Sequence, residues 1–401
     1  MNGKIFFSAF VIFFETFFKL AGVDFTLLGR ISNALLILFV CLNFSIYKNI
    51  FTGEYKKINL LTVIWLLIIL YSGYVNQHLF YDSVSWNGEL LDSMHSMRFE
   101  HVVLYVLNFF SSILYYQYLK RCNKCAVFLK YFMAIMFAYA AISNINVLII
   151  SDSNYLVGNK FYVCYLNLYA ITLYCFYYPV FDKKKVFLFR TFILISILIA
   201  VKTECTTAIL GSLLMYCFFL KLRYKFMLRL YDWKTFLYGL IFFDVIFFFF
   251  TMTFLDNPIM RFIIVDVFGE DMTLTGRLDI YAAVGGLLAE CPLWGFGVNN
   301  AHMMTVMYGV GSNAQNGILN YMLEVGILGV VAFFLLLFEM LKKSKENYGA
   351  YAMICFTYIM LVLSSIEITF TTYFFAMSFL LLLNNETVED SEIMDIKYQM
   401  Q

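Results

Sequence analysis

Long runs of apolar residues, separated by short polar breaks, extend over almost the whole chain. The runs are continuous, so they differ from the alternating apolar and polar positions of a transmembrane barrel strand. The pattern predicts an all-α, polytopic integral membrane protein with about twelve transmembrane helices, because roughly 20 apolar residues cross a bilayer as a helix. The predicted spans are 5–23, 26–46, 58–76, 100–118, 126–149, 161–180, 186–202, 205–221, 235–255, 316–339, 348–365 and 367–384.

The composition agrees with a membrane protein, because 62% of the residues are hydrophobic and only 14% are charged. Most of the 401 residues fall in predicted spans, so we expect a single transmembrane domain, 1–401, without a separate soluble domain. The net charge of +1 gives no electrostatic reason to expect a nucleic-acid partner. The nine cysteines form no cluster with histidine, so we expect no metal and no cofactor. A disulfide between Cys205 and Cys291 remains an alternative.

Basic residues follow every even-numbered predicted span. They are Lys48, Lys56 and Lys57 after span two, Lys120, Arg121 and Lys124 after span four, Lys183, Lys184 and Lys185 after span six, Arg223, Lys225 and Arg229 after span eight, and Lys342, Lys343 and Lys345 after span ten. Connections rich in lysine and arginine face the cytoplasm. Both termini, including the tail 385–401, are therefore predicted to be cytoplasmic, and the odd-numbered connections to face outward.

Few cations remain in the segments predicted to face outward, and three of them lie at the ends of spans. Lys19, Arg30 and Lys202 are predicted to line a cavity, because ionisable groups at membrane depth usually face a protein interior. Together they would form an outward-facing cationic bowl. The alternative for each is that its side chain reaches to the lipid headgroups.

The largest outward connection, 256–315, lies between predicted spans nine and ten and carries the candidate site. Thr275 is a candidate N-cap, and a helix is predicted to continue from it as far as Pro292. Arg277 falls in the first turn, where free backbone N–H groups and a guanidinium together suit a phosphate or pyrophosphate. Arg261 of the same connection is a second candidate for this role, and contact of Arg277 with a lipid headgroup is the alternative.

A segment rich in glycine, asparagine and aromatic residues follows this helix. Trp294, Asn299 and Asn300 offer a ring face and amide groups, and Tyr281 offers a second ring within the preceding helix. A sugar packs its C–H face on aromatic rings while its hydroxyls form hydrogen bonds. The segment is therefore a candidate sugar-binding loop, although ordinary turns have a similar composition.

Several residues of this connection could act as the general base of the candidate site. His302 is the only histidine in the long connection, and an imidazole can take a proton from a hydroxyl near neutral pH. The alternatives in the same connection are Asp266, Glu270, Asp279 and Glu290. Glu324, within predicted span ten, would need a partner such as Arg30, Arg277 or Lys202, so an ion pair and a direct role in the site are both open.

The other long outward connection, 77–99, holds Trp86 among polar residues, and we interpret it as a structural lid at the membrane interface.

Residues 275–329 resemble the O-antigen polymerase and O-antigen ligase superfamily of bacterial membrane glycosyltransferases. The resemblance is carried by Thr275, Gly276, Arg277, Tyr281, Pro292, Gly295, Gly297, Asn316, Leu319, Glu324, Gly326 and Gly329. Members commonly carry a His-Asn pair where this chain has Gln315-Asn316, and glutamine cannot act as a base near neutral pH. They also carry an arginine between spans seven and eight, where this chain offers Lys202.

The resemblance implies a polymerase that joins polyprenyl-pyrophosphate-linked oligosaccharide repeat units into O-antigen or capsular polysaccharide. Its site would face the periplasm or exterior from the bacterial cytoplasmic membrane, and its partners would include the bilayer, a chain-length regulator and a flippase. Arg277, with Lys202 or Arg261, would hold the pyrophosphate, and Arg30, Tyr281, Trp294, Asn299, Asn300, Gln315, Asn316 and Glu324 would contribute to substrate binding. A flippase or transporter of the same lipid, or a ligase, is the alternative.

Overall fold

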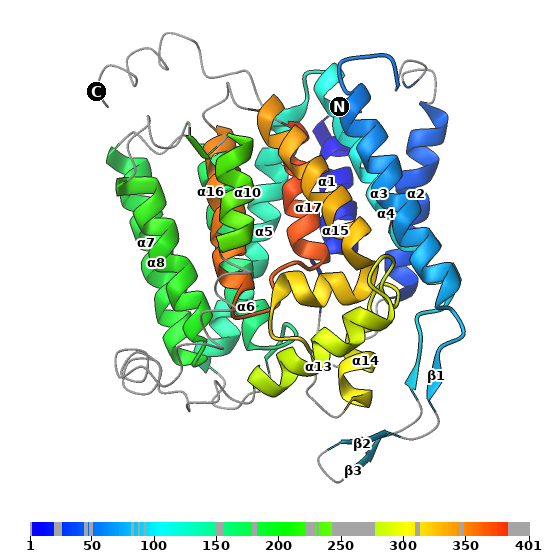
Figure 1. Ribbon diagram of the computed structural model, residues 1–401. Helices are drawn as coiled ribbons and strands as arrows, with labels where there is room; N and C mark the ends of the chain where they lie inside the picture. Colours follow the sequence, from blue (N-terminus) through cyan, green and yellow to red (C-terminus); the bar gives the residue numbers. More distant parts are fainter. Residues whose placement is uncertain are drawn as a thin grey trace.

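The computed structural model describes residues 2–19, 26–43, 47, 51–81, 84–86, 89–91, 94–149, 155–178, 183–221, 229–230, 232–242, 277–308, 313–344 and 349–383. These residues form mainly helices (Figure 1). The helices are α1 (Asn2–Thr16), α2 (Thr26–Leu42), α3 (Lys56–Val75), α4 (Phe99–Arg121), α5 (Cys125–Ile149), α6 (Lys160–Tyr177), α7 (Lys183–Lys202), α8 (Thr206–Lys221), α10 (Trp233–Leu240), α13 (Arg277–Glu290), α14 (Ala301–Met307), α15 (Gly317–Lys343), α16 (Gly349–Ser364) and α17 (Thr372–Phe379), followed by the 3₁₀ turn η4 (Leu380–Leu383).

Within the described residues, four helices are long and apolar enough to cross a membrane: α3, α4, α5 and α15. Shorter apolar helical segments lie within α2, α8 and α16, and a fourth is formed by α17 together with η4. The prediction of a helical chain with membrane-spanning character is therefore confirmed, and the number of twelve spans stays a prediction. The last segment differs from its expected range, because the helix begins at Thr372 rather than at residue 367.

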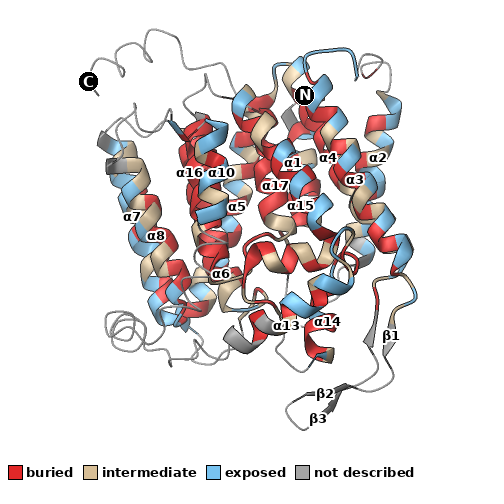
Figure 2. Cartoon of the chain, viewed as in Figure 1, coloured by how far each residue is buried: buried red, intermediate tan, exposed pale blue. Residues whose placement is uncertain are grey.

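The helices pack side by side with α15 against α3, α5 between α1 and α6, and α7 against α8. Figure 2 shows the buried residues concentrated on α15, α16 and α17 in the middle of the molecule. Trp65 of α3 is fully buried there, with its ring centroid 5.4 Å from that of Phe333 and 5.8 Å from that of Phe375. Its indole N–H donates to the Tyr321 hydroxyl at 2.6 Å. The core therefore joins α3, α15 and α17 through aromatic contacts.

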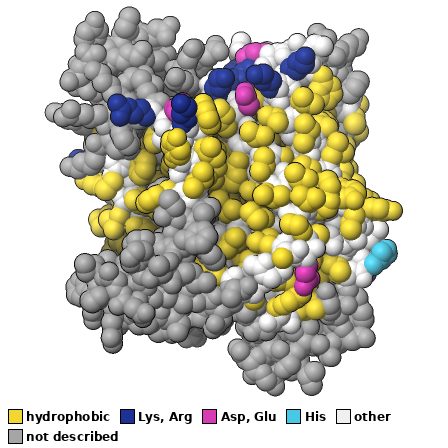
Figure 3. Space-filling model, viewed as in Figure 1, with side chains coloured by type: hydrophobic (Ala, Val, Ile, Leu, Met, Phe, Trp, Pro, Cys, Tyr) yellow, Lys and Arg dark blue, Asp and Glu magenta, His cyan; other side chains and the backbone are white. Residues whose placement is uncertain are grey.

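The two ends of the helical body differ in charge. One end carries Glu54, Tyr55, Lys120 and Lys343, and we call it the basic end because lysine and arginine gather there on the face seen in Figure 3. The other end carries α13 and α14 (Figure 1), and we call it the loop end. A band of hydrophobic side chains lies between the two ends (Figure 3). The orientation of the chain in a membrane stays a prediction.

The connection after α3 contains short strands that the sequence did not predict. β1 (Phe80–Tyr81) pairs antiparallel with β4 (Met94–His95), and β2 (Val84–Trp86) pairs antiparallel with β3 (Glu89–Leu91). The two small sheets extend from the loop end (Figure 1). A structural lid in this connection stays a prediction.

The proposed disulfide is wrong, because all nine cysteines are free. The Cys205 sulfur is 3.5 Å from the Thr207 hydroxyl, and the Cys291 thiol donates to the Gly295 carbonyl at 3.1 Å. Cys122 and Cys125, which have C-x-x-C spacing between α4 and α5, are also unbridged. Each cysteine of the predicted pair is thus used in its own local contact.

Candidate functional site

A break in α15 organises the loop end. Gly326 has φ 67° and ψ −179°, so the helix stops there and restarts in a new direction. In Figure 1 the part before the break lies across the body and the part after it runs along the body. The break leaves backbone carbonyls without helical partners. Two of them accept from the preceding loop: Phe296 N–H donates to the Leu323 carbonyl at 2.7 Å, and Gly297 N–H to the Glu324 carbonyl at 2.9 Å.

Two glycines allow the loop to approach this break. A Cβ atom on Gly326 would lie 2.2 Å from the Leu293 carbonyl oxygen, and one on Gly295 would lie 2.6 Å from the Gly326 nitrogen. Both glycines also have a positive φ of 67°, a conformation that disfavours other residues. Close packing of the backbone therefore explains why positions 295 and 326 are glycines. The consequence for the site is that residues 324 and 299 are held beside each other.

The asparagines of the loop divide into one that supports the structure and one that faces a cavity. Asn300 is buried, its side-chain oxygen accepts from Met97 N–H at 2.9 Å, and its amide donates to the Phe296 carbonyl at 2.7 Å. Asn299 is exposed and has φ 62°. The structure thus uses both polar ends of the Asn300 side chain within the protein and leaves Asn299 at the surface of the candidate site.

A cavity of about 470 Å³ lies next to Asn299. We call it the loop-end cavity. It is lined by Glu15, Thr16, Phe18, Lys19, Tyr105, Asn299, Asn320, Glu324, Ile368, Phe370, Thr371, Thr372, Tyr373 and Phe375. These residues come from α1 and the residues after it, α4, the loop before α14, α15, and α17 with the segment before it, so the cavity is formed where five separate parts of the chain meet. Its volume lies within the roughly 300–1,000 Å³ typical of ligand pockets.

Two carboxyl groups face this cavity from different helices, Glu15 from α1 and Glu324 from α15. The Glu15 Oε2 atom is buried and has no hydrogen-bond partner within the described residues. The Glu324 carboxyl group contacts the backbone N–H of Asn299. In the described part of the chain neither carboxyl group forms an ion pair. A buried carboxyl group without a cation is costly, which marks the cavity as a candidate ligand site.

The three cations of the predicted bowl are not brought together at the cavity. Lys19 lines it, with an exposed side chain. Lys202 is exposed at the end of α7, and Arg30 contacts His101 instead. The ion pairs considered between Glu324 and Arg30 or Lys202 are therefore absent, because each of these cations lies elsewhere.

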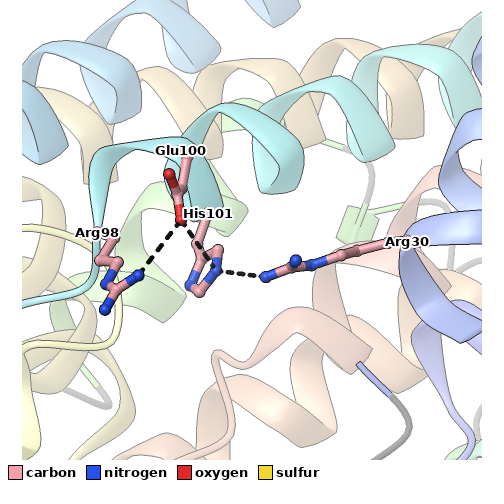
Figure 4. Close-up of polar contacts among 4 residues, drawn as sticks. All are labelled: Arg30, Arg98, Glu100 and His101. Atoms are coloured by element: carbon pink, nitrogen blue, oxygen red, sulfur yellow. Dashed lines mark hydrogen bonds and ion pairs between the residues drawn. The ribbon is translucent and has the colours of Figure 1, made fainter. Parts of the chain in front are cut away.

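Arg30 belongs to a polar group at the start of α4, shown in Figure 4. We call Arg30, Arg98, Glu100 and His101 the arginine cluster. One guanidinium nitrogen of Arg30 lies 2.8 Å from His101 Nε2, and Glu100 Oε1 lies 3.8 Å from both Arg98 Nη1 and His101 Nε2. Because arginine is always a donor, His101 Nε2 is the acceptor in this contact. The cluster is exposed and lies one helical turn from the cavity residue Tyr105, since positions 101 and 105 share a helix face.

The aromatic and polar residues around span ten have structural contacts. The Tyr281 hydroxyl is buried and donates to the Ser365 carbonyl at 3.4 Å. The Trp294 ring packs edge to face on Tyr71 with centroids 4.5 Å apart. Asn316 caps α15 by accepting from Leu319 N–H at 2.9 Å, and Gln315 before it has φ 46°. These residues form the support of the loop end rather than the lining of the cavity.

The predicted phosphate and base residues have separate positions. Arg277 begins α13, and its side chain lies outside the described part of the structure. Arg261, Asp266 and Glu270 also lie outside the described residues, as does the side chain of Asp279.

His302 is exposed on α14 and does not line the cavity, and Glu290 accepts a hydrogen bond from the Tyr308 hydroxyl at the surface. Their catalytic roles stay predictions.

The sequence prediction missed several cavity residues, of which Glu15 is the most informative. Glu15 stands alone in the long apolar run of α1, and such a carboxyl group is a signal of a functional cavity. Tyr105, Asn320 and Thr372 give no comparable signal, because tyrosine, asparagine and threonine occur in many apolar helices of this chain.

Comparison with models of known protein families gives no match for this chain, and comparison with curated protein sequences gives none either. The resemblance to the O-antigen polymerase and ligase superfamily therefore depends on residues 275–329 and on the order of the apolar segments. Of the residues that carry it, Gly295, Gly326 and Asn316 build the loop and the helix break. Among the described residues that carry it, Glu324 is the one that also lines the loop-end cavity.

Proposed function

We propose that this protein is a membrane glycosyltransferase that joins polyprenyl-pyrophosphate-linked oligosaccharide repeat units into a polysaccharide. The observation that carries the proposal is the loop-end cavity, where two carboxyl groups and several hydroxyl and amide groups face one space among apolar helices. A structural cavity would not need this many polar groups, because each costs free energy when it is buried without a partner. Transfer of a sugar chain provides hydroxyl groups that satisfy them.

In the proposed reaction a hydroxyl oxygen of one repeat unit attacks the anomeric carbon of another unit. The new glycosidic bond forms, the bond from the anomeric carbon to pyrophosphate breaks, and its electron pair leaves with polyprenyl pyrophosphate. Negative charge grows on the leaving group, so cations near it lower the barrier. His101 of the arginine cluster is one turn of α4 from the cavity residue Tyr105, and Arg30, which contacts His101, and Arg98, at the start of α4, suit this role. Arg277 at the start of α13 is the other candidate.

The orientation of the chain fits this chemistry. Lysine and arginine concentrate at the basic end, which the positive-inside rule assigns to the cytoplasm. The loop end then faces the periplasm or exterior, where lipid-linked repeat units are joined without a nucleotide sugar. The twelve predicted spans and a position in the bacterial cytoplasmic membrane belong to the same proposal, as do a chain-length regulator and a flippase as partners.

A transporter of the same lipid-linked oligosaccharide is the second candidate, and the break of α15 favours it. Transporters often bind their substrates at discontinuous helices. However, such breaks lie near the middle of the membrane, whereas Gly326 contacts the loop end through Leu293 and Gly295. A ligase is a third candidate that Gln315 disfavours, because its amide cannot act as a base.

Proteoliposomes that contain only the purified protein and lipid-linked repeat units would test the proposal. A polymerase lengthens the glycan in this mixture, a transporter moves the unit across the bilayer without lengthening it, and a ligase lengthens nothing until a different acceptor is added. Arg277→Ala should leave single repeat units unpolymerised. Unchanged chain lengths in this variant would contradict the role of Arg277.

A further inference from the structure

We infer that the loop-end cavity binds the acceptor sugar, and that Glu324 removes the proton from its attacking hydroxyl. The inference depends on the proposed glycosyl transfer and adds to it the kind of substrate that enters the cavity and the base that acts there. The acceptor sugar is the uncharged end of a repeat unit, whereas the donor carries pyrophosphate next to its reacting carbon.

The charges of the cavity favour the acceptor over the donor. Glu15 and Glu324 both face it, and the described residues give neither of them a cation as partner. Among the described residues that line it, the only cation is Lys19, whose side chain is exposed. A pyrophosphate in this cavity would lie beside two acidic groups and would be repelled by each of them when that group is ionised. An uncharged sugar meets no such repulsion.

The remaining lining suits the two kinds of surface that a sugar presents. Phe18, Phe370 and Tyr373 offer rings to the C–H faces of a pyranose. Asn320 and Thr372 offer hydrogen bonds to its hydroxyls, and Glu15 Oε2 needs a donor because it is buried without one among the described groups.

Glu324 is better placed than Glu15 to act as the base, because its backbone is fixed at the break of α15. Its carbonyl accepts from Gly297 N–H at 2.9 Å and from the Ser72 hydroxyl at 3.0 Å. Its carboxyl group also contacts the backbone N–H of Asn299. A base that is held by several contacts can be aligned with a reacting hydroxyl.

The two carboxyl groups also have different neighbours on α4. Glu15 lies near Tyr116, which is eleven residues further along α4 than Tyr105 and therefore nearer the basic end. Glu324 lies near Tyr105 itself, one turn from His101. Glu324 thus shares its neighbour Tyr105 with the face of α4 that carries His101, the partner of Arg30, so the reacting carbon and the attacking hydroxyl can meet beside it.

In the reaction the acceptor O–H bond breaks and its proton passes to a Glu324 carboxylate oxygen. The freed electron pair of the oxygen forms the new bond to the anomeric carbon. The bond between that carbon and pyrophosphate breaks at the same time, and its electrons stay with the leaving group. Glu324 then returns its proton to water or to the released pyrophosphate. Glu15 accepts a hydrogen bond from another acceptor hydroxyl and takes no proton.

Glu324→Gln and Glu15→Gln test this division in proteoliposomes with purified lipid-linked repeat units. The amide of glutamine has the size of the carboxyl group but cannot act as a base. Glu324→Gln should reduce the initial rate of polymer formation about 100-fold or more, with binding of the repeat unit changed less than about threefold. Glu15→Gln should weaken binding and raise KM, with a smaller loss of kcat. Glu54→Gln, at the basic end, is the matched control and should keep the wild-type rate.

A pH profile separates a base from a supporting residue. The wild-type rate should fall on the acid side as the base becomes protonated, and the residual rate of Glu324→Gln should lack this fall. Glu324→Asp keeps the carboxylate and should recover part of the rate, and it replaces the glutamine variant if that variant does not fold.

Two outcomes would overturn the inference in distinguishable ways. If the wild-type protein lengthens the glycan and Glu324→Gln does so within threefold of its rate, the role of Glu324 is wrong while the proposed function stands. If the wild-type protein binds the repeat unit but never lengthens it, the proposed function fails and the inference fails with it.

Discussion

The helices α3 and α15 pack against each other, and the carboxyl groups at their two ends differ in whether a cation lies beside them. At the basic end, Glu54 Oε1 lies 2.7 Å from Lys343 Nζ, and the same ammonium group lies 3.9 Å from the centre of the Tyr55 ring. At the loop end, Glu324 of the same helix faces a cavity, and the described residues supply it with no cation. The carboxylate of Glu54 is thus neutralised by Lys343 at the surface, whereas the carboxyl group of Glu324 faces the cavity without a cation among the described residues.

This difference separates a structural contact from a candidate site. An exposed ion pair such as the one between Glu54 and Lys343 adds little to stability, because water and salt screen it. An unpaired carboxyl group in a cavity lowers stability, so a protein keeps it only where a ligand or a reaction uses it. The comparison predicts large functional effects at the loop end and small effects at the basic end.

The largest effect should come from Gly326→Ala, which removes the break that sets the loop end apart. The new Cβ atom would overlap the Leu293 carbonyl oxygen, 2.2 Å away. The native backbone would also require alanine to adopt the positive φ of Gly326. We expect a loss of at least about 3 kcal/mol of folding free energy, from strain and overlap together. The melting temperature in detergent and the polymer yield should both fall sharply.

Gly285→Ala is the control for this change. Gly285 lies in α13, and a Cβ atom there would have no atom within 4 Å. Alanine should leave the stability unchanged or raise it by about 0.5–1 kcal/mol, because it lowers the entropy of the unfolded chain. Equal losses in both variants would mean that the break of α15 has no special importance.

The next effect should come from Arg30→Gln, which tests whether cations outside the cavity hold the pyrophosphate. Arg30 contacts His101 in the arginine cluster but is exposed, so its loss should cost little stability. The rate of polymer formation should fall about tenfold or more if it stabilises the leaving group. Lys57→Gln removes an exposed cation from the start of α3 and should leave the rate unchanged. Similar rates in both variants would exclude a special role of Arg30.

A moderate effect on stability should come from Asn300→Ala, which tests whether the buried Asn300 contributes more to stability than the exposed Asn299. The change leaves Met97 N–H and the Phe296 carbonyl without their side-chain partner. We expect a loss of about 1–3 kcal/mol in thermal or denaturant unfolding. Asn299→Ala should cost about 1 kcal/mol or less, because that side chain is exposed and the cost comes from the positive φ of 62°, which alanine adopts less readily than asparagine. The opposite order would place the structural asparagine at position 299.

The smallest effect should come from Glu54→Gln. The hydrogen bond from Lys343 holds the pKa of Glu54 below its ordinary value of 4.5, so the pair stabilises the protein above that pH. This stabilisation is lost as the pH falls from about 4.5 through the lowered folded-state pKa. Because 69% of the Glu54 side chain is exposed, we expect less than about 0.5 kcal/mol at neutral pH. Unfolding curves of both proteins at pH 7 and pH 3 would measure it.

The positions of several helices followed closely from the sequence, whereas α1 ends at Thr16, before the end of the predicted span 5–23. Apolar runs located α4, α5 and α15 to within a few residues, because a long apolar run in one segment satisfies its own backbone hydrogen bonds only as a helix. The strands at 80–95 and the late start of α17 were not predicted. These elements are short and depend on contacts with distant segments, which periodicity does not reveal.

The candidate site was predicted in part. Asn299 and Glu324 were named from the sequence and both line the cavity, whereas Trp294, Asn300 and Asn316 were named with them and have structural contacts. The residue types alone could not separate these groups, because an amide that binds a sugar and an amide that caps a helix have the same chemistry. Their separation depends on which atoms lie opposite each side chain.

The sequence by itself determined that this is a helical membrane protein with its basic residues at one end and a polar segment between two late helices. Hydrophobicity and charge act locally, so each can be read along the chain. Only the tertiary structure decided that Glu15 of α1 and Glu324 of α15, more than 300 positions apart, face one cavity. That meeting depends on the packing of α1, α4, α15 and α17 and on the backbone contact of Gly295 with Gly326, which are long-range effects that local patterns do not contain.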